Sequence, residues 1–334
     1  MMRGMTTNPG LADVARRAGV SAATASRVLS GRGPSSPASR DAVRQAAAEL
    51  GYVPHPVARR LARRSGTRIV FAVRDARPDI LRDPFVTRAA AAMAAATEPE
   101  GLGTALLRLP LDAAAELDRL ATDRSVAALV LAGHDRALMD RLPAALRSRT
   151  ATIGAGGSDV DSAAGIGALL RHLHRNGRRR IALIAGPRWL AASRAPLAAY
   201  ATFLRETGSP LRVVHGDFTS ARGRAATREI LRRWPGTDAI ATVSDATAVG
   251  VLQALSAAGI RVPDDLAVTG FDDSPLAEAI HPGLSTATHP VELIAVSAVR
   301  AALGAPSPGR LFPSRPIFRA TCGGGPAPAL TGGA

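Results

Sequence analysis

The stretch LADVARRAGVSAATASRVLSGRG, residues 11–33, decides the fold of the N-terminal part of the chain. Its first half has apolar residues at the three- and four-residue spacing of a helix, and Gly19 then ends that helix as a C-terminal glycine does. Ser21 is placed to cap a second helix, on which the apolar residues Ala25 and Val28 recur at the same spacing. Two short helices joined by a glycine-containing turn form a helix-turn-helix.

The second helix has an outer face that suits contact with DNA. A third helix is predicted over residues 39–50, and three helices are enough to close a small core. The outer side chains of the second helix are short or hydrogen-bonding, namely Ala22, Ala23, Thr24, Ser26 and Arg27. Such a helix can lie in a major groove about 12 Å wide, from which bulky side chains would hold it out. An ordinary helical hairpin has the same spacing, so the pattern alone leaves that alternative open.

The positive charge of the chain is concentrated in the same region. The net charge is +15; residues 1–65 hold 11 arginines against three acidic residues, a net +8. The remaining 269 residues hold 31 arginines against 24 acidic residues, a net +7. A compositional preference for arginine explains much of the total in a chain without lysine, but not its concentration. The asymmetry indicates a nucleic-acid-binding head on a more neutral body.

After Gly66 the sequence changes to alternating strands and helices. The predicted strands are eight apolar runs, over residues 68–73, 104–109, 126–132, 150–154, 180–185, 211–215, 239–243 and 266–270. The predicted helices are alanine-rich stretches, over residues 85–96, 113–121, 162–176, 196–207, 222–234, 247–259 and 292–303. This alternation implies parallel sheets with right-handed crossovers. Two groups of four strands predict two doubly wound subdomains with a ligand cleft at the carboxyl ends of the strands.

Several motifs together resemble one family. The first stretch, with ELGYVPHPVARRLARR at residues 49–64, resembles the head and hinge of the lactose/galactose-repressor (LacI/GalR) family of bacterial transcription regulators. Landmarks similar to the family's effector-binding core are RRRIALIAG (178–186), HGDF (215–218), AIATVSDATAVGVLQAL (239–255) and GIRVPDDLAVTGFDDSPLAEAIHPGLSTATHP (259–290). The resemblance is dense over the first 65 residues and thinner through nearly all the rest.

The resemblance implies an α/β protein with an N-terminal three-helix helix-turn-helix head. The core would resemble periplasmic sugar-binding proteins, with the chain crossing three times between two doubly wound parallel-sheet subdomains. The expected divisions are a head (8–52), a hinge (53–66), a core (67–322) and a disordered tail (323–334). Within the core they are an N-subdomain (about 67–162 plus 286–312) and a C-subdomain (about 163–285 plus 313–322). The tail has no heptads, so a dimer is expected rather than a coiled-coil tetramer.

In that family the second helix of the head reads base edges. Carried over, the residues that face bases are Ala22, Ala23 and Arg27, and those that mostly contact phosphates are Ser21, Thr24 and Ser26. Arg27 suits a guanine, to which an arginine donates two hydrogen bonds. The family usually has Ser or Thr before the first helix, where this chain has Gly10. We expect a weaker cap and one weaker phosphate contact there.

The resemblance also implies that residues 56–63 become helical on DNA and pair with the hinge of the dimer mate. Leu61 would enter the minor groove, where an apolar wedge unstacks and kinks a flexible base step. Its neighbours Arg59 and Ala62 are assigned to the same contact. Packing of Leu61 against the body is the alternative.

Effector-binding residues are expected in the cleft of the core. The resemblance places the carboxylates of Asp161, Asp245 and Asp272 at strand ends, where they would bind a sugar hydroxyl or a base nitrogen. It places Phe218 as an aromatic platform, and Phe85 would close the opposite wall. A ring face suits the apolar face of a sugar or a planar base. Helix capping by each aspartate and core packing of each phenylalanine are the alternatives.

The chain departs from the family at two cleft positions. Where the family usually has an arginine in the helix after the fifth strand, this chain has Pro196, and Arg194 is the candidate substitute. Ser244 replaces the usual Asn before Asp245. The family's arginine at the position of Pro196 commonly holds ligand hydroxyls or carboxylates. Its loss leaves two alternatives open, an altered ligand or repression that is independent of a ligand.

We therefore expect a cytoplasmic, homodimeric, sequence-specific regulator of transcription, a repressor. It would bind a pseudo-palindromic double-stranded DNA operator, with its DNA affinity controlled by a small-molecule effector, a sugar or another metabolite. The alternative is a solute-binding receptor with the same body and no role in DNA regulation. The basic head argues against that alternative, as does the lack of an apolar signal-peptide core in residues 1–10.

Catalysis, cofactors, metals and membranes are not expected. The glycine-rich stretch at residues 154–157 lacks the GxGxxG spacing, and no P-loop occurs. The seven histidines show no metal-binding spacing, and the single cysteine, Cys322, excludes an intramolecular disulfide and fits a reducing compartment. No segment has the roughly 18 uncharged apolar residues of a membrane span.

Overall fold

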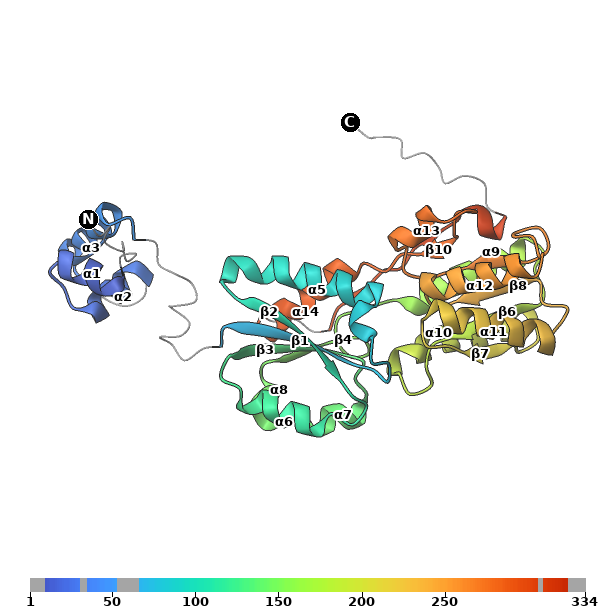
Figure 1. Ribbon diagram of the computed structural model, residues 1–334, viewed down its shortest axis with the longest axis horizontal. Helices are drawn as coiled ribbons and strands as arrows, with labels where there is room; N and C mark the ends of the chain where they lie inside the picture. Colours follow the sequence, from blue (N-terminus) through green and yellow to red (C-terminus); the bar gives the residue numbers. More distant parts are fainter. Residues whose placement is uncertain (1–9, 31–34, 53–65, 306–308, 324–334) are drawn as a thin grey trace, which may run out of the picture. The chain divides into compact units, whose positions relative to one another are not determined.

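The structure, a computed structural model, describes residues 10–30, 35–52, 66–305 and 309–323 (Figure 1). The described residues divide into two compact units. The head holds the described residues up to Thr67 together with Glu100–Leu102, and the core holds the others.

The head consists of three helices: α1 (Leu11–Arg17), α2 (Ala22–Ser30) and α3 (Pro37–Glu49). In the turn between α1 and α2, Gly19 has a φ of +65°, a left-handed conformation that glycine adopts without strain. The side chain of Ser36 accepts a hydrogen bond from the backbone N of Ser39 and caps α3. The predicted helix-turn-helix and third helix are confirmed.

The core of the head is made of small apolar side chains, which let three short helices approach closely. The buried members are Val14, Ala15, Ala25, Val28, Val43, Ala46 and Ala47. At the start of α1, Gly10 provides no side-chain cap, as expected. The Asp13 carboxylate instead accepts a hydrogen bond from the backbone N of Gly10 at 2.9 Å. Half of a capping box is therefore kept.

The first sheet of the core has four parallel strands in the order β2-β1-β3-β4. Their bounds are Arg68–Arg74 (β1), Gly103–Leu109 (β2), Val126–Ala132 (β3) and Thr150–Ile153 (β4). One face is covered by α5 (Pro84–Thr97) and α14 (Val291–Ala302), which pack on each other. The other face is covered by α6 (Ala114–Thr122), α7 (Arg136–Asp140) and α8 (Ala144–Arg147), as Figure 1 shows.

The second sheet has four parallel strands in the order β7-β6-β8-β9. Their bounds are Ile181–Ala185 (β6), Val213–His215 (β7), Ala239–Thr242 (β8) and Ala267–Thr269 (β9). The long helices are α9 (Ser162–Arg175), α10 (Arg194–Thr207), α11 (Ser220–Arg233) and α12 (Asp245–Ala257). Right-handed crossovers in this strand order put α10 on one face and α11 and α12 on the other.

All eight predicted strands and seven predicted helices of the core are present, and the α/β fold class is confirmed. The sequence did not predict the short helices α7, α8 and α13 (Pro275–Ala279). It also missed two small pairings, of β5 (Asp159–Val160) with β11 (Leu311–Phe312) and of β10 (Thr286–Ala287) with β12 (Pro316–Ile317). Short 3-10 helices cover Ile80–Arg82, Glu98–Glu100, Ala191–Ser193 and Ala320–Cys322. Among the described helices, none is long and apolar enough to cross a membrane.

The close packing of α11 on α12 depends on glycines. A Cβ on Gly250 would overlap the backbone carbonyl of Ser220, and one on Gly223 would overlap the backbone carbonyl of Thr247. Backbone atoms cannot move aside as a flexible side chain does, so a methyl group there forces the two helices apart.

We expect Gly250→Ala to lower the free energy of unfolding by about 1–3 kcal/mol, because overpacking outweighs the better helix propensity of alanine. Gly167→Ala in α9 is the matched control. There the three atoms nearest the new Cβ belong to the flexible end of Arg171, the closest at 3.2 Å, so we expect no loss of stability. Urea unfolding of both variants measures the difference, and equal stabilities would contradict this account of the α11–α12 contact.

Candidate functional site

The outer face of α2 is made of small and polar residues. Ala25 and Val28 point into the core of the head. The predicted DNA-contacting residues lie elsewhere on this segment: Ser21, Ala22, Ala23, Ser26 and Arg27 are exposed and Thr24 is half-buried. Ser21 Oγ accepts a hydrogen bond from the backbone N of Thr24 at 3.1 Å and caps α2 as predicted. The structure thus brings the six residues onto α2 and its N-cap, and their contact with DNA stays a prediction.

The hinge assignments cannot be placed in the same way. Arg59, Leu61 and Ala62 lie outside the described residues, as do residues 324–334 of the predicted tail. Their roles stay predictions.

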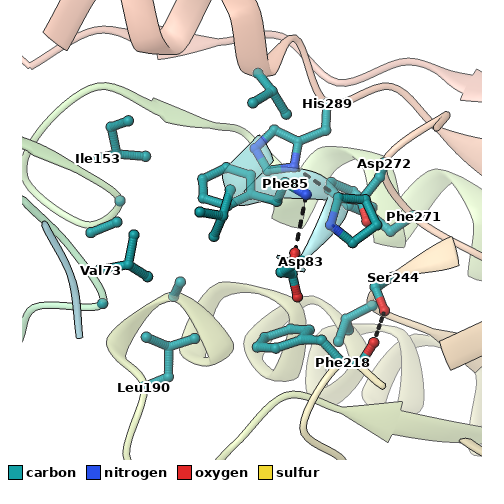
Figure 2. A pocket seen from close by; sticks show the side chains of 18 of the residues that line it. Val73, Asp83, Phe85, Ile153, Leu190, Phe218, Ser244, Phe271, Asp272 and His289 are labelled. Carbon is teal, nitrogen blue, oxygen red and sulfur yellow. Dashed lines mark hydrogen bonds and ion pairs between the residues drawn. The ribbon is translucent and has the colours of Figure 1, made fainter. Parts of the chain in front are cut away.

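A cavity of about 190 Å³ lies in the core where strands of both sheets end. Val73 at the end of β1 and Ile153 at the end of β4 line it, and so do Ser244 after β8 and Asp272 after β9. Figure 2 shows these side chains together with three phenylalanines, Phe85, Phe218 and Phe271. The cavity occupies the position at the carboxyl ends of parallel strands where α/β proteins bind ligands.

Asp272 is held at this cavity by its backbone and by one histidine. His289 Nδ1 lies 2.9 Å from Asp272 Oδ1, and the imidazole stacks on Phe85 with ring centroids 5.4 Å apart. The backbone N of Asp272 donates to the carbonyl of Ala287 at 2.9 Å. Asp272 has a φ of +120°, a region that residues other than glycine rarely adopt. Strain of this kind is concentrated at functional sites.

Asp83 forms a second acidic wall. Its carboxylate accepts a hydrogen bond from the backbone N of Phe85 at 3.0 Å, which caps α5 and fixes the start of that helix. The Arg77 guanidinium pairs with both Asp83 and Asp75, at 3.2 Å in each case. Burial raises the pKa of Asp83, the Arg77 charge opposes that shift, and the negative charge of Asp272 adds to it. Asp83 and Asp272 therefore act on each other across the cavity.

Phe218 depends on a glycine beneath it. Its φ is +69°, and its ring lies over Gly186, where an added Cβ would be 2.8 Å from the ring atom Cζ. The same Cβ would overlap the hydroxyl of Ser193. Ser244 Oγ donates to the carbonyl of Phe218 at 3.3 Å and holds the backbone from the other side. The ring is thus fixed as one wall of the cavity (Figure 2).

Three of the six predicted effector residues line the cavity: Phe85, Phe218 and Asp272. Asp161 does not, because its side chain accepts a hydrogen bond from the backbone N of Ala164 and caps α9. Arg194, at the start of α10, is exposed and does not line the cavity, whereas Pro196 does. The contacts of these residues with a ligand stay predictions.

Asp245, the sixth predicted residue, is buried next to the cavity wall. Its carboxylate accepts hydrogen bonds from the backbone N and the hydroxyl of Ser274, at 2.8 and 2.9 Å, and from Thr286 Oγ1 at 2.7 Å. Burial, with the negative charge of Asp272, raises the pKa of Asp245 to about 7. Next to it, Ser244 caps α12 through the backbone N of Thr247, so the serine that replaces the family's Asn has a structural role.

Several lining residues escaped the sequence analysis. They are Arg77, Asp83, Asp159, Ser193, Phe271 and His289. Asp83 directly precedes Pro84–Phe85, and a carboxylate before a proline is a helix-start signal that points to the same wall. Phe271 and His289 lie within the 259–290 landmark. Ser193 and Asp159 carry no local signal.

The combination of this head and this core defines a DNA-binding transcription regulator with a ligand-binding body. Residues 10–55 match the model of the bacterial regulatory proteins, lacI family, and residues 170–322 match that of the periplasmic binding protein-like domain. The solved structure of the transcriptional regulator CelR–cellobiose complex is similar, with a TM-score of 0.67 and 30% identity over 94% of this chain and 99% of that chain. The lac repressor dimer bound to operator and the anti-inducer ONPF has the same fold, with a TM-score of 0.76, 24% identity and 95% and 99% covered.

Characterised relatives lead to the same class. The HTH-type transcriptional regulator CelR of Thermobifida fusca is 34% identical over 303 residues, 86% of this chain and 88% of the relative. The HTH-type transcriptional repressor CytR of Escherichia coli (strain K12) is 28% identical over 310 residues, 83% and 84% of the two chains. The chain belongs to the lacI family of bacterial regulatory proteins, and the resemblance stated from the sequence is confirmed.

The raised pKa of Asp245 gives stability a defined pH dependence. The carboxyl titrates near pH 4 in the unfolded chain and near 7 in the folded one, so the folded state holds the extra proton between these values. The resulting stabilisation is complete below about pH 4 and is lost as the pH rises through about 7. We expect the free energy of unfolding of the wild type, minus that of Asp245→Asn, to fall from about pH 5 to about pH 8.

Asp265→Asn is the control for that titration. The Arg261 side chain lowers the pKa of the exposed Asp265 to about 2, so its replacement has no pH-dependent effect in this range. Unfolding curves of the three proteins across the range make the measurement. A constant difference between wild type and Asp245→Asn would show that Asp245 does not titrate there.

Proposed function

We propose that this protein is a homodimeric repressor that binds a pseudo-palindromic operator and that an effector in the core cavity controls its affinity for DNA. One observation supports this proposal most: the same chain has an exposed face of small and polar residues on α2 and a cavity at the strand ends of the core. We propose the division into a head (8–52), a hinge (53–66), a two-part core (67–322) and a tail (323–334) as its working parts. Its place of action is the cytoplasm, where the DNA is.

The effector, in this proposal, is a small molecule, a sugar or another metabolite. One similar structure is a complex with cellobiose, which supports a small-molecule effector. Phe85 and Phe218 offer ring faces to the ligand, and Asp272 offers a hydrogen-bond acceptor. Asp245 acts indirectly: it holds Ser274, which lines the cavity, by two hydrogen bonds, and it interacts with the charge of Asp272. Contacts of Asp161 and Arg194 with the ligand remain predictions, for which the cleft would have to change shape.

We further propose that the chain has no catalytic activity and needs no cofactor or metal. The family assignment supports this, because its named relatives are transcriptional regulators. The alternative of a solute-binding receptor without a role in DNA regulation has lost its support, since the regulatory head matches the family model over residues 10–55.

Selection of bound duplexes from a random DNA pool, at near-physiological salt, tests the proposed function. Low salt would favour nonspecific contacts of arginines with phosphates. We expect enrichment of one palindrome with two half-sites about a helical turn apart and a flexible central step. No enrichment, with or without added metabolite extract, would contradict a sequence-specific regulator.

Replacing Arg27 tests the reading helix. Its side chain is exposed on α2, with Nε 3.3 Å from the carbonyl of Ala23. We expect Arg27→Ala to cost about 1–3 kcal/mol of discrimination at one base pair in each half-site. Gel-shift titration against operators changed at single positions measures the effect.

Arg44→Ala is the matched control, since it removes the same charge from an exposed position on α3. This variant should weaken binding similarly for all operators and keep the base preference. An unchanged base preference in Arg27→Ala would remove Arg27 from the reading face.

A further inference from the structure

The core cavity is lined by more negatively than positively charged side chains. Four carboxylates line it, those of Asp75, Asp83, Asp159 and Asp272, against three guanidinium groups, those of Arg74, Arg77 and Arg88. His289 adds positive charge only when it is protonated. The formal charges alone therefore leave one carboxylate in excess, and the pairing of the arginines increases that excess.

Two of the three arginines are held by carboxylates outside the lining. Arg74 pairs with Asp135 at 2.9 Å and also donates to the carbonyl of Leu111. Arg88 pairs with Glu292 at 2.8 Å. Neither guanidinium is left to neutralise an anion in the cavity. Arg77 is shared between Asp75 and Asp83, so its single charge faces two negative charges.

The remaining carboxylates have weak compensation. Asp159 accepts a hydrogen bond from the backbone N of Val160 and has no ion pair with any described residue. Burial raises the pKa of Asp159, and His289 and His134 oppose that shift. Burial is also the main cause of the raised pKa of Asp83 and of Asp245, and the charge of Asp272 adds to it. With four lining carboxylates and only the Arg77 guanidinium left to face them, the cavity holds more negative charge than its own residues balance.

An independent feature of the same cavity points to a missing ligand. Ser193 lines the cavity, is only 4% exposed, and its Oγ has no hydrogen-bond partner among the described residues. A buried hydroxyl without a partner costs free energy, which a ligand hydrogen bond would recover. Phe85 and Phe218 provide aromatic rings in the same cavity, and such rings suit the apolar body of a ligand.

We propose that the effector of this regulator is a small organic cation, a protonated amine carried on a ring or a compact apolar body. The ammonium group lies between Asp83 and Asp272, the body contacts Phe85 and Phe218, and a polar group of the ligand reaches Ser193 Oγ. The volume of about 190 Å³ suits one six-membered ring, since a cavity of about 150 Å³ holds benzene. This inference rests on the proposed function of the cavity as the effector site. It excludes phosphorylated and carboxylated ligands.

The test uses the full-length protein and three probes of the same shape: cyclohexylammonium, cyclohexanol and cyclohexanecarboxylate, at matched ionic strength and neutral pH. Thermal-shift titration gives an apparent Kd for each. We expect cyclohexylammonium to bind at least about tenfold more tightly than cyclohexanol, and the carboxylate to bind more weakly than either.

Charge-neutralising variants locate the binding. Asp272→Asn should bring the Kd values for cyclohexylammonium and cyclohexanol to within about threefold of each other. Asp140→Asn, at an exposed position with 72% of its side-chain surface accessible, removes one negative charge away from the cavity and should keep the tenfold preference. Should Asp272→Asn fail to fold, the comparison of the three probes on the wild type still decides the question.

Equal binding of ammonium and alcohol, preference for the carboxylate, or no binding of any probe would overturn the cationic effector. A preference that persists in Asp272→Asn would also overturn it, since the cation would then lie elsewhere. These outcomes leave the operator selection untouched. If that selection enriches a palindrome while the probe titration fails, the protein is still a sequence-specific regulator, and only the positive charge proposed for its effector is wrong.

Discussion

The pair formed by Asp272 and His289 is the contact on which the geometry of the core site depends. Asp272 follows β9 in the second sheet, and His289 lies in the segment that leads to α14, which packs on the first. Phe85, at the start of α5 beside the first sheet, stacks on the same imidazole. One carboxylate thus connects elements of both halves of the core. Its charge also adds to burial, the main cause, in raising the pKa of Asp83 on one side and of Asp245 on the other.

Unusual backbone conformations are concentrated at the same place. Among the described residues other than glycine, positive φ values occur at Phe218, Asp272 and Asp273. All three follow strands of the second sheet, where the chain must turn to present a side chain to the cavity instead of continuing into a helix. Such conformations cost on the order of 1–3 kcal/mol each and persist where surrounding contacts hold them. Here the Ala287 carbonyl holds Asp272, and Ser244 with Gly186 holds Phe218.

The sequence predicted the fold better than it predicted the site. Apolar runs such as residues 126–132 identify buried strands because both faces of a parallel sheet are covered, and no other local structure suits them as well. Short helices such as α7 and α8 lack that length of signal. At the site, strand-end position alone selected Asp161 and Asp245 together with Asp272. A position at a strand end places the backbone at the cleft, but hydrogen bonds decide where the side chain points. The Asp161 carboxylate, for example, caps α9 by accepting a hydrogen bond from the backbone N of Ala164. The Ser193 hydroxyl lacks a hydrogen-bond partner because of how the folded core surrounds it, and no local sequence pattern predicts that.

An effector controls DNA binding only if it binds two states of the protein with different affinity. A positively charged ligand placed between Asp83 and Asp272 competes with His289 for the same carboxylate. When His289 is released, Phe85 loses its stacking partner, and the segment before α14 loses this side-chain contact but keeps its backbone hydrogen bonds to the residues that follow β9. Both α5 and α14 cover the first sheet, whose strand β1 begins at Arg68, directly after the predicted hinge. In this proposal the charge of the ligand, the pairing of Asp272 and the chain that leads to the DNA-binding head are therefore linked by consecutive contacts.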